Sequence, residues 1–191
     1  TPAPAGSYVS TQGATTATPA PPGTYITTSG ASAATPVPAG TYQPNSGATT
    51  SLLAPAGTYI PVTGASSSTA ALQAPLGSYV PVAGASAATL ASPGTYVGTT
   101  GATAATLAPP GSYVTTAGAS AATPVPAGTY QPNAGSTTSL LAPAGTYIPV
   151  TGASSTAAAV LAPVGTYIPV TGASSSTAAV LAPLGSYVPV A

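Results

Sequence analysis

Tyrosine is the only aromatic residue in this sequence, and it recurs at a nearly constant spacing. Successive tyrosines from Tyr8 to Tyr187 are separated by 17 or 20 residues. Each follows a Gly-Ser or Gly-Thr pair and precedes Val, Ile or Gln, and a second glycine comes five residues later in every complete unit. A fixed period of about 20 residues is typical of one supersecondary unit stacked many times. The eleven units begin at Pro4, Pro21, Pro38, Pro55, Pro75, Ser92, Pro109, Pro126, Pro143, Pro163 and Pro183.

The order of residues within a unit favours short strands. Ser/Thr-Tyr-Val/Ile combines aromatic and branched residues, which are enriched in strands. In the unit that begins at Pro143, Thr146 and Ile148 would face one side of the strand, and Tyr147 and Pro149 the other. Proline ends such strands because it cannot donate a ladder hydrogen bond, so we expect the tyrosine strand to span three or four residues. The second glycine predicts a turn with unusual φ, followed by a returning strand.

These elements predict an all-β fold without helices, because each unit carries two glycines and usually several prolines, which break helices. We expect an elongated linear stack of about eleven 17- or 20-residue repeats of short strands or hairpins, with a β-solenoid-like rod as the alternative. Residues 1–191 form a single tandem array, interpreted as a fragment or the body of a larger chain. The three additional residues of the long units, which begin at Pro55, Pro143 and Pro163, always follow the second glycine and indicate a loop.

Composition narrows the function. The chain has no Asp, Glu, Lys, Arg, His or Cys. General acid–base catalysis needs a titratable group, metal sites need His, Cys or carboxylate ligands, and nucleic-acid affinity comes largely from Lys and Arg. We therefore predict a protein that is not an enzyme, uses no cofactor or metal and binds no nucleic acid. Glycine and proline interrupt every apolar stretch well before the roughly 18 residues of a membrane span, so no span is expected in this segment.

The tyrosines are the candidate stacking residues between repeats, because aromatic rings bury the most area in such a sequence. Replacing Tyr113 by Ala is expected to cost about 3–5 kcal/mol, the range for a buried aromatic side chain. Gln43 is interpreted as an ordinary surface residue. The predicted stacking residues are Tyr8, Tyr25, Tyr42, Tyr59, Tyr79, Tyr96, Tyr113, Tyr130, Tyr147, Tyr167 and Tyr187.

The motif Pro-Ala-Gly-Thr-Tyr followed by Gly-Ala resembles the ephrin-receptor-like, cysteine-rich repeats of extracellular proteins. Residues 54–65, APAGTYIPVTGA, match the frame of that family with Ala54 in the place of a cysteine, and residues 126–136, PAGTYQPNAGS, match it with Val125 in that place. The resemblance extends over all eleven units. It implies an extracellular structural module whose cysteines would staple each hairpin, a role that stacking, glycans or a partner chain would have to take over here.

Serine and threonine are abundant, and together with proline they suggest O-glycosylation. A chain without charge lacks the usual source of solubility, which a glycan coat would supply. The sequence has no Asn-x-Ser/Thr site, so glycans would be O-linked. The candidate acceptors lie in the long units after the second glycine: Ser66, Ser67, Ser68, Thr69, Ser154, Ser155, Thr156, Ser174, Ser175, Ser176 and Thr177.

The function predicted from these observations is a structural protein of an extracellular fibre, filament or surface stalk, located outside the cell or at its surface. Its expected partners are copies of itself, because unpaired strand edges favour self-association, together with covalent glycans. Two alternatives stay open. One is an ice-binding repeat protein, and the other is a spacer that presents an adhesive domain outside this segment.

Overall fold

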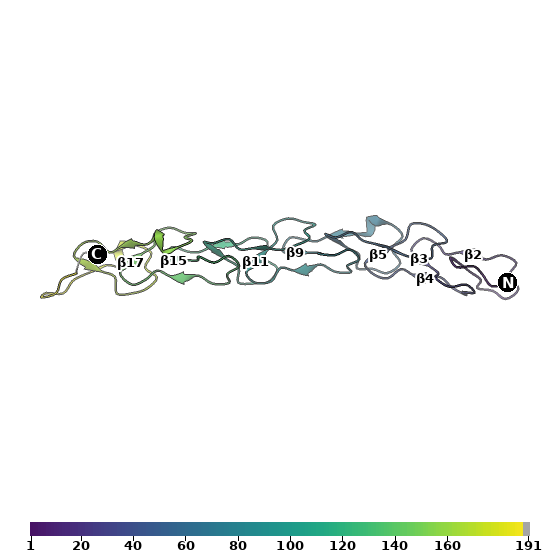
Figure 1. The fold of residues 1–191 in the computed structure, drawn as a ribbon, viewed down its shortest axis with the longest axis horizontal. Coiled ribbons are helices and arrows are strands. Elements are labelled where there is room, and N and C mark those ends of the chain that lie inside the picture. Colours follow the sequence, from purple (N-terminus) through teal and green to yellow (C-terminus); the bar gives the residue numbers. More distant parts are fainter. Residues whose placement is uncertain (189–191) are drawn as a thin grey trace. The chain divides into compact units, whose positions relative to one another are not determined.

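The computed structural model describes residues 1–188 and consists of short antiparallel hairpins (Figure 1). Each hairpin joins two strands adjacent in the chain, and no closed sheet forms among these residues. They hold no α-helix, so the all-β class expected from the repeat is confirmed. The ten hairpins are β1 (Ser7–Tyr8) with β2 (Thr18–Pro19), β3 (Thr24–Tyr25) with β4 (Thr35–Pro36), β5 (Thr41–Tyr42) with β6 (Leu52–Leu53), β7 (Thr58–Tyr59) with β8 (Leu72–Gln73), β9 (Ser78–Tyr79) with β10 (Thr89–Leu90), β11 (Thr95–Tyr96) with β12 (Thr106–Leu107), β13 (Ser112–Tyr113) with β14 (Thr123–Pro124), β15 (Thr129–Tyr130) with β16 (Leu140–Leu141), β17 (Thr146–Tyr147) with β18 (Val160–Leu161), and β19 (Thr166–Tyr167) with β20 (Val180–Leu181).

The contacts between residues divide the chain into two compact units. Unit 1 comprises Thr1–Leu90 and Thr99–Ala104, and unit 2 comprises Ala91–Gly98 and Ala105–Ala191. Both units are built from the same kind of hairpin. Across residues 1–188, no helix has the length and apolar character needed to span a membrane.

Each strand is two residues long, shorter than the three or four residues expected. In the first hairpin Ser7 faces Pro19 and Tyr8 faces Thr18, and every other hairpin repeats this register. The ladder ends at the tyrosine because the next residue bonds to a different hairpin. The N–H of Ile26, for example, donates to the carbonyl of Ala48 at 3.0 Å.

A glycine turn joins one hairpin to the next. In the turn before β3, the N–H of Thr24 donates to the carbonyl of Pro21 at 3.1 Å, and Gly23 has φ of 82°. This geometry is that of a type II turn, whose third residue needs positive φ and is therefore glycine. The hydroxyl of Thr24 also donates to the Pro21 carbonyl, at 2.7 Å. Each threonine that precedes a tyrosine makes this second bond, as does Ser112, which favours a hydroxyl residue at this place.

Three recurring backbone hydrogen bonds join the hairpins to one another. Between the consecutive repeats of β3 and β5, Gly23 N–H donates to Gln43 C=O at 2.7 Å and Ile26 N–H donates to Ala48 C=O at 3.0 Å. In the third bond Gly47 N–H, in the repeat of β5, donates at 2.7 Å to the C=O of Ala20, the last residue of the repeat of β1. The second glycine supplies the third donor, and its positive φ confirms the turn predicted there (78° at Gly30). Each hairpin is thus held by the hairpin next to it in the chain and by the one two repeats away.

The core is formed by small side chains rather than by tyrosine. The residue after each tyrosine, here called the post-tyrosine position, is buried from Ile26 to Ile168, with Val80 and Ile148 fully so. The residue three before the turn glycine is the second buried position from Ala3 to Ala142, as at Ala54. These residues form compact clusters, one of which joins Ala54, Ile60 and Ala65.

Gln43 occupies a post-tyrosine position and is only 5% exposed, so its interpretation as a surface residue is wrong. Its Nε2 donates to the carbonyl of Thr50 at 2.7 Å, and its Oε1 accepts from the N–H of Asn45 at 3.0 Å. Gln131 repeats both bonds in unit 2, with Thr138 and Asn133. The amide is tolerated in the core because its polar atoms are paired, as buried polar groups require. The repeat pattern of the sequence does not predict these side-chain hydrogen bonds.

The longer loop of each long unit contains a single turn of 3₁₀ helix. These turns are η1 (Ser68–Ala70), η2 (Thr156–Ala158) and η3 (Ser176–Ala178). They precede the second strand without changing the register, because Tyr59 still faces the first residue of its partner strand, Leu72. The prediction of a loop at this place is confirmed, and the 3₁₀ turn was not foreseen.

Candidate functional site

The chemistry available to this chain is that of hydroxyl, phenol and amide groups. Residues 1–188 contain no group of three or more His, Cys, Asp or Glu side chains that could hold a metal ion. The candidate functional sites are therefore surfaces and end faces of the hairpins.

The tyrosines lie between core and solvent. Tyr8 to Tyr147 are half-buried, Tyr167 is 38% exposed and Tyr187 is 85% exposed. Tyr42 packs against the cluster of Ala54, Ile60 and Ala65, of which Ile60 and Ala65 belong to the next repeat. Tyr130 packs in the same way on the cluster around Ile148. These two rings contact a neighbouring repeat, while the fully buried side chains are those one residue later.

The candidate glycan acceptors all lie at the long hairpin loops. All are exposed except Ser67 and Ser175, which are half-exposed. Ser67 caps η1, because its Oγ accepts from the N–H of Thr69 at 3.1 Å, and Ser155 caps η2 in the same way. Ser66 directly precedes the Ser67 cap in an exposed position. A sugar on Ser66 would leave the cap intact, whereas one on Ser67 would crowd it.

A third surface consists of the second strands, which are exposed in every hairpin and often apolar. Leu53, Leu107, Leu141 and Leu161 are between 57% and 62% exposed. Leu53 covers a second glycine, since a Cβ placed on Gly84 would lie 2.9 Å from its Cδ2. Much of each leucine still faces solvent. Exposed apolar patches of this kind mark interaction surfaces when they are contiguous.

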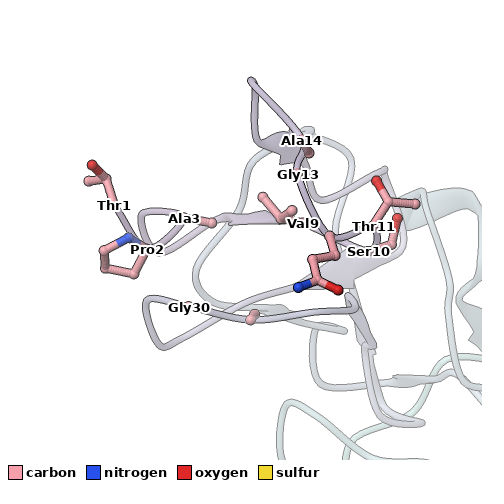
Figure 2. Close-up of a pocket in the computed structure, with 11 residues that line it drawn as sticks. Thr1, Pro2, Ala3, Val9, Ser10, Thr11, Gly13, Ala14 and Gly30 are labelled. Atoms are coloured by element: carbon pink, nitrogen blue, oxygen red, sulfur yellow. The ribbon is translucent and has the colours of Figure 1, made fainter.

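The fourth site is a groove of about 350 Å³ at the N-terminal face of unit 1. Figure 2 shows Pro2 and Ala3 on one side of it, with Val9, Gly13 and Gly30 around the remainder. The side chains that line the groove, Gln12 among them, are all non-ionisable. They can offer hydrogen bonds and apolar contact to a ligand. The sequence gave no sign of this groove, because it follows from how successive hairpins are bonded.

Comparison with known protein families and with curated proteins finds no match for this chain. The resemblance to ephrin-receptor-like repeats therefore stands on the Gly-Thr-Tyr and Gly-Ala frame alone.

Proposed function

We propose that this chain is a non-catalytic structural protein that forms an extracellular fibre, filament or surface stalk. In this proposal it associates with copies of itself and carries O-linked glycans. The observation that carries the proposal is the repeated bonding of each hairpin to the next through backbone groups, which builds structure from repetition without any charged side chain.

The bonding between hairpins suits a structural role. The bonds of Gly23, Ile26 and Gly47 recur at Gly128, Gln131 and Gly152 in unit 2. Because stability then adds up from nearest-neighbour terms, such an array gains structure with each repeat. In such an array no repeat depends on a single contact with a distant part of the chain, and this suits a protein that forms extended structures.

The uncharged, partly apolar surface of the chain suggests that glycans or other copies of the protein cover it. It contains no charge, and large apolar side chains such as Leu53 and Val82 are 58% and 65% exposed. Proteins normally remain soluble through net charge and small apolar patches. Glycans, other copies or both would meet this need, and the exposed serines beside η1, η2 and η3 are suitable glycan acceptors.

An ice-binding role has weaker support. Such a role would need a regular array of free threonine hydroxyls, whereas the threonine before tyrosine is already engaged. The hydroxyls of Thr24, Thr58 and Thr95 each donate to a carbonyl at 2.7 Å.

The extracellular location is proposed from the family resemblance and from the O-glycan acceptors.

Electron microscopy of the native material, combined with intact mass, tests this function. We expect extended assemblies and a mass above the 17.6 kDa of the polypeptide, in steps of one sugar residue. Mapping should place sugars on Ser66 and its counterparts Ser154 and Ser174 before the capping Ser67. Polypeptide made without glycosylation machinery is the matched control, and it should show the bare mass. Round, monodisperse particles of bare mass from the native source would contradict the proposal.

A further inference from the structure

Each second strand has one edge that bonds to its hairpin partner and one edge that faces outward. In the hairpin of β5 and β6, Ala54 N–H donates to Gly40 C=O at 2.9 Å, and Leu52, two residues earlier, is paired with β5. The backbone groups of successive residues point to opposite edges of an antiparallel strand. Ser51 and Leu53 therefore direct their N–H and C=O groups to the outward edge of β6.

The outward groups of Ser51 and Leu53 have no backbone partner among residues 1–188. Leu52 and Leu53 are 43% and 58% exposed, so this edge is open to solvent. The same arrangement recurs in the other short repeats that have leucine at the second position of the second strand, which are those of β10, β12 and β16. These four are called here the open-edged hairpins, and an unpaired edge of this kind can template a further strand.

Three other hairpins close this edge with proline, which has no N–H to donate. The residues at the place of Leu53 are Pro19 in β2, Pro36 in β4 and Pro124 in β14. These hairpins keep the register of the open-edged ones, so the fold itself does not use the N–H at this position. Proline at an exposed edge prevents pairing between molecules, and the open-edged hairpins lack this protection.

The long repeats close the edge in another way. Ala71, at the place of Ser51, donates its N–H to Ser68 C=O at 3.1 Å in the turn of η1, and Ala159 and Ala179 repeat this bond at η2 and η3. One donor is therefore withdrawn from the outward edges of β8, β18 and β20. The candidate glycan acceptors all lie in these same long repeats, so sugars would be attached to hairpins whose edges are already closed.

We propose that open-edged hairpins of two copies pair edge to edge, with β6 or β16 of one copy antiparallel to β6 or β16 of the second. Both strands end the sequence Thr-Thr-Ser-Leu-Leu, at residues 49–53 and 137–141. With Leu52 opposite its equivalent, Ser51 of each copy faces Leu53 of the other and exchanges two hydrogen bonds with it, as in an antiparallel ladder. The joint contains four N–H···O bonds and one pair of leucine side chains.

The occupant is argued from the chemistry of the edge. Ser51 and Leu53 each offer one N–H and one C=O, so the edge is complementary to its own copy after a two-fold rotation. The chain has no charged residue. A charged partner strand would have to bury unpaired charge in the joint, which is costly, whereas a second copy brings none. The inference rests on the proposed self-association and names the surface that makes it.

Proline substitution at the open edges tests this pairing, measured by sedimentation of the unglycosylated chain over a concentration series. One variant combines Leu53→Pro, Leu90→Pro, Leu107→Pro and Leu141→Pro, because the register of β2 shows that proline is compatible with the hairpin at this position. The control replaces the same leucines by alanine, which removes the side chains and keeps the N–H groups. We expect the wild type and the alanine variant to form species larger than one chain, and the proline variant to lose them.

Three outcomes would overturn the edge pairing. A proline variant that associates like the wild type would do so while leaving the proposed fibre intact, since other surfaces would then hold the copies together. Equal loss of association in both variants would show that the leucine side chains, and not the edge bonds, make the contact. A wild type that stays a single chain would also contradict the pairing, whereas microscopy of the native material tests the fibre separately.

Disulfide trapping tests the register without any proline substitution. The protein has no cysteine, and opposite residues of a non-hydrogen-bonded antiparallel pair have Cα atoms about 4.5 Å apart, within the range of a disulfide. We expect oxidation of Leu52→Cys/Leu140→Cys to give a ladder of linked chains on a non-reducing gel. The control, Leu72→Cys/Val160→Cys, has the same strand positions in long repeats with closed edges and should give no ladder. All four residues are between 42% and 49% exposed, so equal ladders from both variants, or none from the first, would overturn the register.

Discussion

The turn that joins two hairpins and the loop within a hairpin follow different rules. The turn is constant in length, holds its glycine at positive φ, and brings that glycine against another repeat: a Cβ on Gly23 would lie 2.4 Å from the carbonyl oxygen of Gly64. The loop after the second glycine varies in length, and in the long units it carries exposed hydroxyls and a 3₁₀ turn. Length is fixed where the backbone contacts a neighbouring repeat and is free where it meets solvent.

The largest loss of stability is expected when a methyl group is placed in a turn between hairpins. Gly111→Ala would direct its Cβ to 2.3 Å from the Gly152 oxygen, so we expect a loss of about 4 kcal/mol or more of unfolding free energy. Gly145→Ala has the same φ within 3° (83° against 86°) but meets open space, and its cost should be the left-handed strain of about 1–2 kcal/mol. Urea denaturation of both variants measures the difference, and equal losses would argue that the close approach of the turns is unimportant.

The next largest effect is expected in the core beside the turn. Ile60 is fully buried against Ala54 and Ala65, so Ile60→Ala should cost about 2–5 kcal/mol. Val62, two residues further on, is 55% exposed, and Val62→Ala should cost less than about 0.5 kcal/mol. Thermal and chemical denaturation of the pair would test whether burial at the post-tyrosine position dominates. A larger loss for the valine variant would reverse the assignment of the core.

Replacing Gln43 tests whether a polar residue at the post-tyrosine position stabilises the fold as isoleucine does in other repeats. Gln43→Ala would leave the Thr50 carbonyl and the Asn45 N–H without their partner, and we expect a loss of about 2–3 kcal/mol. Gln12 is exposed, and Gln12→Ala serves as the control at less than about 0.5 kcal/mol. If both replacements had small effects in a denaturation titration, the buried amide would be contributing nothing.

Tyr113 should matter less than its aromatic character alone suggested. The ring is half-buried, so Tyr113→Ala should cost about 1.5–2.5 kcal/mol, half of the range for a fully buried aromatic side chain. Tyr113→Phe keeps the ring and is expected to be close to neutral. A loss of about 3–5 kcal/mol for the alanine variant would restore the tyrosine as the main stacking residue.

The smallest effect is expected in the loop. Deleting Ser66–Ser68 converts the long repeat of β7 and β8 into the short form seen in β9 and β10. The register should survive, and stability should change by less than about 0.5 kcal/mol, as for a surface change. Amide hydrogen exchange at Ile60 would report any slip, because its N–H is bonded to Ala85 C=O at 3.1 Å.

Periodicity was sufficient to predict the hairpins, the glycine turns and the site of insertion, because each depends on local backbone requirements. It did not predict which side chain of the Tyr-Ile or Tyr-Gln pair is buried. That choice depends on the bonds of the post-tyrosine residue to the next hairpin, such as that from Ile26 N–H to Ala48 C=O, and these cannot be read from one repeat. The groove escaped prediction for the same reason, since it is visible only once the bonding between repeats is known.

The independence of register from loop length also bears on how such a chain changes over generations. Residues 30–66 and 118–154 are the same except for Ser46 against Ala134 and Ala48 against Ser136, and both copies build the same cluster, around Ile60 and Ile148 respectively. Misaligned recombination between such near-identical stretches of DNA adds or removes whole hairpins. Because every junction recreates the same contacts, alleles with different repeat numbers would each encode a foldable chain. The number of repeats, and with it the length of the protein, can therefore change over generations while each intermediate form still folds.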